Sequence, residues 1–271
     1  MKDKIKEKSI KTISNPFSTG GGGASFENLV GAFYVSQLLC DKLIYGHLEA
    51  GTVKEIAFQN KWMGIDVDDL IIYGNAEINS DKPEEVIKPK LILQIKNRLN
   101  FIISDTKFTA LIKECWQTFN NSSFNLGYDQ IGIMLGTITA KVKDHFIRLL
   151  LWAKTSNSST EFISKVNIPK YASQEMRDYY NMINEILSNA DEDNRWKFLK
   201  HLKVLKLELI STDSKDYLES IENLRSVVIN QDLQKAVLLF TYILEKCALY
   251  NKNGGRISFN TLHQDIIVIA L

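Results

Sequence analysis

Two short apolar runs constrain the fold most, because each has the composition of a buried β-strand and yet carries charged or amide side chains. The first run, LIIY, directly follows Asp68 and Asp69, and the second, LILQIK, contains Gln94 and Lys96. Side chains of a strand alternate between its two faces, so Gln94 and Lys96 share one face. If the two runs pair as antiparallel neighbours, Asp69 lies beside Gln94 and Lys96 at one end of the sheet.

This polar group predicts a site for a cation and a phosphate. A lysine inside an apolar strand is costly to desolvate unless a charged partner is near, and adjacent aspartates repel each other unless a cation lies between them. Carboxylate and amide oxygens are ligands of Mg²⁺, and an ammonium binds phosphate. We therefore expect Mg²⁺ close to Asp68, Asp69 and Gln94. The alternative is an edge hairpin with one face in solvent.

The hydrophobic pattern along the chain predicts an α/β fold, with a mixed central sheet flanked by helices and a mainly helical C-terminal half. Strands are expected over 53–59, 69–73, 91–96, 130–138 and 202–210. Helices are expected over 25–43, 105–119, 141–154, 173–187, 191–201, 215–229 and 232–249, with an exposed hairpin loop over 75–90 and a Ser/Asn-rich link over 156–160. The expected organisation is a basic flexible N-terminus over 1–18, a core over 19–155 and a mainly helical subdomain over 156–271.

Composition and residue spacing argue against a membrane protein, a histidine-ligated metal protein and a disulfide-bonded secreted protein. The chain has 271 residues and a formal net charge of +1, so its overall charge favours no particular partner. It contains no run of eighteen apolar residues, so we expect no membrane association and a cytoplasmic location. The histidines have no ligand-like spacing, and the cysteines are odd in number and far apart, as free thiols of a reducing compartment are: Cys40, Cys115 and Cys247.

Four consecutive glycines at 20–23 precede the helix that carries Glu27 in its first turn. Main-chain N–H groups at such a helix start can approach a phosphate, although the glycines can equally form only a flexible entry to the helix. The lysine motif of a nucleotide-binding P-loop is missing, so an NTPase is the least favoured class. Glu27 either favours the helix dipole or reaches a metal at the adjacent sheet end.

Taken together, these motifs resemble the PD-(D/E)xK restriction-endonuclease-like superfamily. The similarity lies in a helix that bears Glu27, a strand that begins at Asp69, and a strand that ends in Gln94-x-Lys96. With Phe108 and Trp116 in the following helix, the chain resembles one branch, the effector endonucleases of bacterial antiphage systems. This branch occurs in cyclic-oligonucleotide-activated nucleases, in STAND NTPase sensors and with HerA-type ATPases. The resemblance covers roughly residues 18–140.

The resemblance implies a role for each site residue. Asp69 would be the principal metal ligand and Asp68 a second candidate, with the side-chain carbonyl of Gln94 and the carboxylate of Glu27 completing the set. Lys96 would orient or activate the attacking water and stabilise charge in the transition state. The metal would be Mg²⁺, or Mn²⁺ in its place. Gln94 stands where the superfamily usually has Asp or Glu, which leaves open whether one metal ion binds or two.

The implied substrate is double-stranded DNA, cut with low sequence specificity. Basic residues would contact its phosphates: Lys88, Lys90, Arg98 and Lys107. An unregulated nuclease would be toxic, so we expect control by oligomerisation, as a homo-oligomer fused to or associated with an NTPase or sensor module. The competing hypothesis is a non-catalytic scaffold or a DNA-binding and assembly module. Asp69 and Lys96 speak against it, because a scaffold has no use for either.

Overall fold

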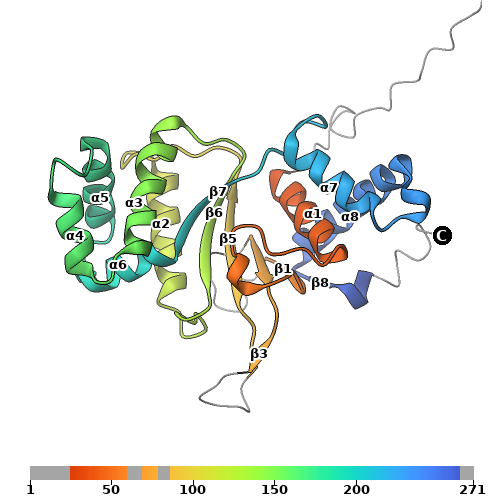
Figure 1. Ribbon diagram of the computed structural model, residues 1–271, viewed down its shortest axis with the longest axis horizontal. Helices are drawn as coiled ribbons and strands as arrows, with labels where there is room; N and C mark the ends of the chain where they lie inside the picture. Colours follow the sequence, from red (N-terminus) through yellow and green to blue (C-terminus); the bar gives the residue numbers. More distant parts are fainter. Residues whose placement is uncertain (1–24, 60–66, 68, 79–85, 263–271) are drawn as a thin grey trace, which may run out of the picture.

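A computed structural model describes residues 25–59, 67, 69–78 and 86–262, and places a six-stranded sheet between two groups of helices (Figure 1). From edge to edge the strands are β7 (Leu202–Lys206), β6 (Gln130–Leu135), β5 (Lys90–Lys96), β2 (Leu70–Tyr73), β1 (Glu55–Phe58) and β8 (Arg256–Ser258). The neighbours β7, β6 and β5 are parallel, whereas β5, β2, β1 and β8 pair antiparallel. The expected α/β class with a mixed sheet is confirmed.

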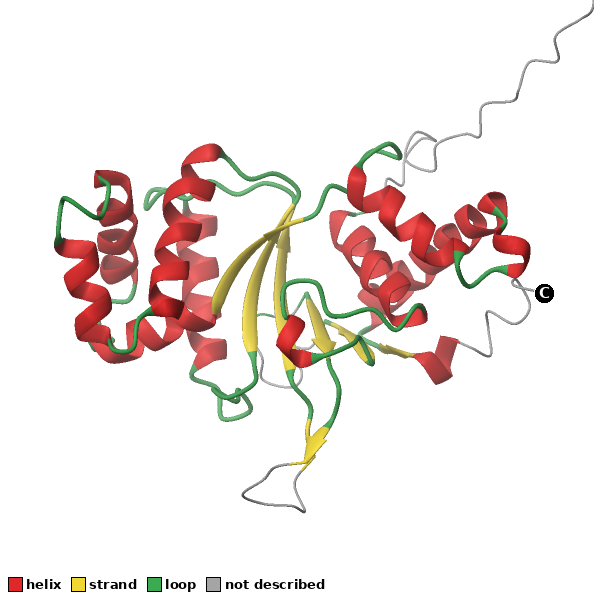
Figure 2. Ribbon diagram, viewed as in Figure 1, coloured by secondary structure: helices red, strands yellow, loops and turns green. Residues whose placement is uncertain are grey.

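Each face of the sheet has its own helices (Figure 2). One face packs against α1 (Phe26–Leu39), α7 (Lys215–Arg225) and α8 (Leu233–Asn253). The other faces α2 (Thr106–Phe119), α3 (Ile147–Thr155) and α6 (Glu192–His201), with α4 (Ser159–Asn167) and α5 (Gln174–Ile186) packed outside them. Strand alternation explains the division, since Leu70 and Leu93 contribute to the α1 side while Ile71 and Ile92 contribute to the α2 side.

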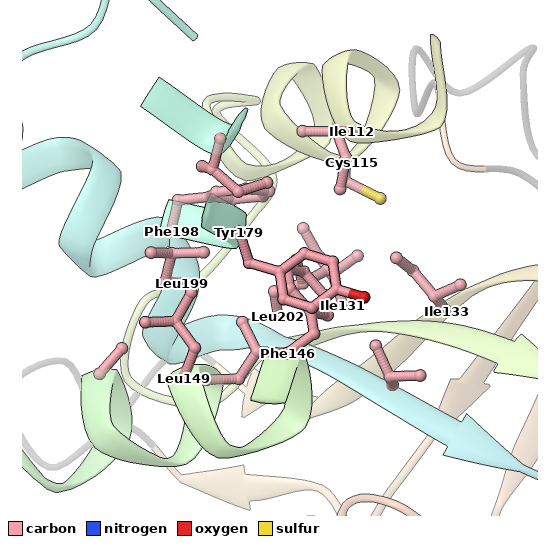
Figure 3. Close-up of a cluster of buried hydrophobic side chains, with 14 of the residues drawn as sticks. Ile112, Cys115, Ile131, Ile133, Phe146, Leu149, Tyr179, Phe198, Leu199 and Leu202 are labelled. Atoms are coloured by element: carbon pink, nitrogen blue, oxygen red, sulfur yellow. The ribbon is translucent and has the colours of Figure 1, made fainter. Parts of the chain in front are cut away.

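The core on the α2 side packs aliphatic side chains around aromatic rings, among them Phe146, Tyr179 and Phe198 (Figure 3). Phe146 lies 5.2 Å from Phe101 and 6.4 Å from Phe108, measured between ring centroids. Phe146 belongs to a π-helical turn, η3 (Val142–Phe146), that continues directly as α3.

The sheet extends across the expected boundary between 19–155 and 156–271. Strands β7 and β8 come from the second segment, and α7 and α8 pack beside α1 from the first. Strands that lie far apart in the sequence therefore belong to one sheet. Residues 1–18, the glycines at 20–23 and Asp68 lie outside the described residues.

Two expected loops contain regular structure. Helix α4 begins within the expected link, because Ser158 caps it by accepting a hydrogen bond from the main-chain N–H of Glu161 (3.1 Å). The expected hairpin loop over 75–90 contains a short ribbon of β3 (Glu77–Ile78) and β4 (Val86–Ile87) that projects from the sheet (Figure 1). Single 3-10 turns, η1 (Leu48–Ala50) and η4 (Ile229–Gln231), complete the elements. None of the helices in the described ranges is long and apolar enough to cross a membrane.

Candidate functional site

The pairing of β2 with β5 brings the polar residues of the two strands together. Leu70 pairs with Leu93 in an antiparallel ladder, as the sequence predicted. Asp69 precedes Leu70 and therefore stands opposite Gln94, with Lys96 two residues farther along β5 and on the same face. The site thus forms where β2 begins and β5 ends.

Three donors converge on one oxygen of Asp69. Its Oδ2 accepts hydrogen bonds from the Gln94 side-chain amide, from the Ile95 main-chain N–H (2.6 Å) and from Lys96 Nζ (3.4 Å). The side chains of Asp69 and Gln94 are buried, whereas that of Lys96 is 39% exposed. A fixed, buried carboxylate therefore holds an ammonium that remains accessible to solvent.

Glu27 takes part in none of these three hydrogen bonds. By strand alternation Asp69, Gln94 and Lys96 lie on the sheet face that turns toward α2, whereas Glu27 is in α1, which covers the other face. Glu27 Oε2 instead accepts a hydrogen bond from Asn251 Nδ2 of α8 (3.3 Å). Its place in the first turn of α1 also suits the helix dipole.

The predicted phosphate-binding residues divide between the two ends of β5. Lys88 precedes the strand and lies eight residues before Lys96, roughly 26 Å away at about 3.3 Å per residue. Arg98 follows Lys96 by two residues, and Lys107 is in the first turn of α2; both side chains are exposed. Only Arg98 and Lys107 therefore follow the strand end that carries Lys96.

Two further exposed lysines lie on the segment that follows the neighbouring strand β6, and they were not anticipated from the sequence. Because β5 and β6 are parallel, Lys96 pairs with Leu135, and the turn after β6 continues to Lys141 and Lys143. The Gly136 N–H in this turn donates to the Asn97 carbonyl (3.2 Å), which fastens the turn beside the end of β5. The strand predicted over 130–138 and the helix predicted over 141–154 already placed these lysines after β6. The sequence did not show that β6 runs parallel to β5, which brings the turn after β6 beside the end of β5.

The donor set fits a magnesium ion better than a transition metal. No group of three or more His, Cys, Asp or Glu side chains that could hold a metal occurs among the described residues. The site offers the Asp69 carboxylate, a hard donor, and beside it the amide of Gln94, whose nitrogen donates to Asp69 Oδ2 and whose oxygen is also a hard donor. Mg²⁺ characteristically binds through one or two carboxylates and keeps several waters or substrate oxygens, whereas zinc sites need nitrogen or sulfur ligands.

A second lysine at the opposite end of β5 has a different environment. Lys90 Nζ lies 3.2 Å from Asp129 Oδ2, and the two side chains are only 13% and 2% exposed. Asp129 also accepts from the main-chain N–H groups of Lys90 and Asn125 (3.1 and 2.9 Å), although its burial still raises the pKa of its carboxyl. This ion pair fastens the loop before β6 to β5 and has no exposed ammonium to offer a substrate.

No protein-family model matches the sequence, and no curated protein matches it. Among solved structures, the chain is similar to the Cap4 SAVED/CARF-domain containing receptor of Acinetobacter baumannii, with 10% identity, a TM-score of 0.49, and coverage of 87% of this chain and 44% of the receptor. The Moraxella osloensis receptor of the same description gives 12% identity and a TM-score of 0.47 over 87% and 44%.

A further Acinetobacter baumannii receptor structure, with the cyclic trinucleotide 2'3'3'-cAAA, gives 9% identity and a TM-score of 0.48 over 87% of this chain and 42% of that one. The chain thus spans less than half the length of these receptors. Identities this low and TM-scores below 0.5 transfer no function to this chain.

Proposed function

We propose that this chain is a metal-dependent endonuclease that hydrolyses phosphodiester bonds of double-stranded DNA with low sequence specificity. The observation that carries the proposal is the convergence of Gln94, Ile95 and Lys96 on the buried Asp69 carboxylate at one end of the sheet. A carboxylate, an amide side chain and a partly exposed ammonium in one place are groups that metal-assisted phosphodiester hydrolysis can use.

Each residue of the site would have a distinct task. Asp69 orients Lys96, so that the ammonium points toward a bound phosphate rather than moving freely. Lys96 would align the attacking water and stabilise the negative charge that develops on the phosphate oxygens. Asp69 and Gln94 would hold Mg²⁺, which when bound polarises the scissile phosphate and lowers the pKa of water.

Binding of DNA would use its phosphates. Arg98, Lys107, Lys141 and Lys143 are exposed on segments that follow the ends of β5 and β6. Cations on such segments bind the sugar–phosphate backbone without distinguishing bases. The role as an effector in antiphage defence, and control through oligomerisation by an attached or associated sensor or NTPase, are part of the proposal and derive from the sequence resemblance.

The test is cleavage of supercoiled plasmid with Mg²⁺, using the chain both free and artificially multimerised. We expect cleavage that depends on the metal and that Lys96→Ala and Asp69→Asn each abolish. Lys215→Ala, an exposed lysine of α7 on the far helical layer, is the matched control and should cleave as the parent does. Cleavage that survives both site substitutions would refute the assignment.

One observation favours a second candidate, the non-catalytic scaffold. Asp69 accepts from the Ile95 main-chain N–H, so its carboxylate also extends the β2–β5 ladder beyond Leu70 and has a structural use. A scaffold predicts no cleavage by the folded parent chain in any state of assembly, together with a clear loss of stability in Asp69→Ala. That pair of results would replace the nuclease proposal.

A further inference from the structure

A hollow of about 200 Å³ lies along the free edge of the sheet, away from the Asp69 site. Its lining combines residues of α3 and α6 with four consecutive residues of β7, Leu202 to Leu205. Consecutive side chains of a strand point to opposite faces, so a hollow that touches four in a row follows the edge of the strand rather than either face. The order of the sheet places β7 at that edge (Figure 1).

The outer edge of β7 offers main-chain groups for pairing. The Leu207 N–H donates to the Leu135 carbonyl of β6 (3.0 Å), so by alternation the main-chain groups of Val204 and Lys206 point away from β6. The Lys206 carbonyl is already used, since it accepts from the Tyr45 hydroxyl (2.9 Å). In the part of the chain that the structure describes, no strand pairs with this edge.

The positive charge of the hollow favours a partner that carries negative charge. Six of its lining residues are apolar and the other three are lysines: Lys154, Lys200 and Lys203. Lys154 pairs with Glu49, whose side chain is 68% exposed, and Lys203 Nζ donates to the Gly46 carbonyl (2.7 Å). Two cations close to apolar surface repel each other, and burial together with Lys154 lowers the pKa of Lys203 to about 8. A ligand that brings negative charge would relieve this repulsion.

We infer that the edge of β7 binds an extended, acidic segment of a partner protein, which adds a short strand beside Val204 and places apolar side chains against α3. This is strand addition, in which main-chain hydrogen bonds supply affinity and alternate side chains supply specificity. A second copy of this chain is disfavoured as the partner, because its β7 would bring further lysines to the hollow rather than the negative charge that Lys154, Lys200 and Lys203 favour. The surface lies two strands away from β5, so the partner need not cover Lys96.

The experiment uses the full chain and a fluorescein-labelled peptide of alternating Glu and Val, with the Lys/Val peptide for comparison. We expect the acidic peptide to bind at least tenfold more tightly in fluorescence anisotropy. The double variant Lys154→Glu/Lys200→Glu should lose at least tenfold in affinity, whereas Lys215→Glu on α7 should retain it. Equal binding of the two peptides, or an unchanged double variant, would overturn the proposal.

Strand pairing has its own readout, which attraction between charges alone does not move. Deuterium uptake over residues 202–206 should slow when the acidic peptide is added, because the outward N–H groups of Val204 and Lys206 gain acceptors. Binding without slower exchange in this segment would refute strand addition. Neither measurement depends on cleavage, so this inference and the nuclease proposal fail independently.

Discussion

Two lysines on one strand permit a sharp test of the proposed site. Lys96 and Lys90 both form an ion pair from β5, but Lys96 is 39% exposed and its partner Asp69 is 10% exposed, whereas Lys90 and Asp129 are 13% and 2% exposed. Replacing each lysine with methionine keeps the length of the side chain and removes the charge. The two substitutions should separate a catalytic ammonium from a structural one.

The expected magnitudes follow from burial. A partly exposed ion pair contributes at most about 1 kcal/mol, and after Lys96→Met the Asp69 carboxylate keeps two of its three donors, so the free energy of unfolding should change by less than about 1 kcal/mol. Removing Lys90 leaves Asp129 buried without its counter-ion, which should lower the free energy of unfolding by about 3 kcal/mol. Catalysis should respond in the opposite sense. Loss of the ammonium at the reacting phosphate should slow cleavage at least about 100-fold, or about 2.7 kcal/mol.

Urea unfolding gives the stability of each variant, and Mg²⁺-dependent plasmid cleavage per folded molecule gives its activity. The reasoning predicts a stable, inactive Lys96→Met and a destabilised, active Lys90→Met. If Lys96→Met destabilises the chain as strongly as Lys90→Met does, then Lys96 is a structural group. If Lys96→Met cleaves at the parent rate, the site is not catalytic.

Two further substitutions test the frame around the sheet. In Gly74→Ala the new Cβ would lie 2.0 Å from the Ala50 carbonyl oxygen, a main-chain atom that cannot move away easily. Chemical denaturation should therefore show that the free energy of unfolding falls by at least about 2 kcal/mol. An unchanged denaturation midpoint would contradict the close approach. His47 is buried and donates from Nε2 to the Tyr128 carbonyl (2.6 Å), and burial lowers its pKa below the ordinary 6.5 despite the nearby Glu49. As the pH falls below about 6.5, the unfolded chain takes up a proton that the folded chain resists, so the free energy of unfolding should decrease. His47→Gln should make this decrease with pH smaller. Urea titrations at pH 7.5, 6.0 and 5.0 measure the free energy of unfolding of both proteins.

Much of the local structure was predictable because it depends on neighbours in sequence. The strands near 69–73 and 91–96 and the helix near 105–119 follow from hydrophobic spacing, and Asp105 caps that helix as expected. The contact of Asp69 with Gln94 and Lys96 was also predictable, since antiparallel neighbours fix which residues face each other. Helix α4 was missed because its serine- and asparagine-rich start has the composition of a loop, although the same serine caps the helix.

The sequence by itself determined which segments are strands and helices, and which polar residues interrupt the apolar runs, because these properties depend on spacing along the chain. Only the tertiary structure decided the order and direction of the strands and the face of the sheet that each helix covers. The parallel pairing of β5 with β6 brings the turn before Lys141 beside Lys96, and packing with α7 and α8 sets α1 and Glu27 on the face opposite Asp69. Strands β7 and β8 join the sheet from far along the chain, since long-range pairing depends on how all the apolar faces pack together.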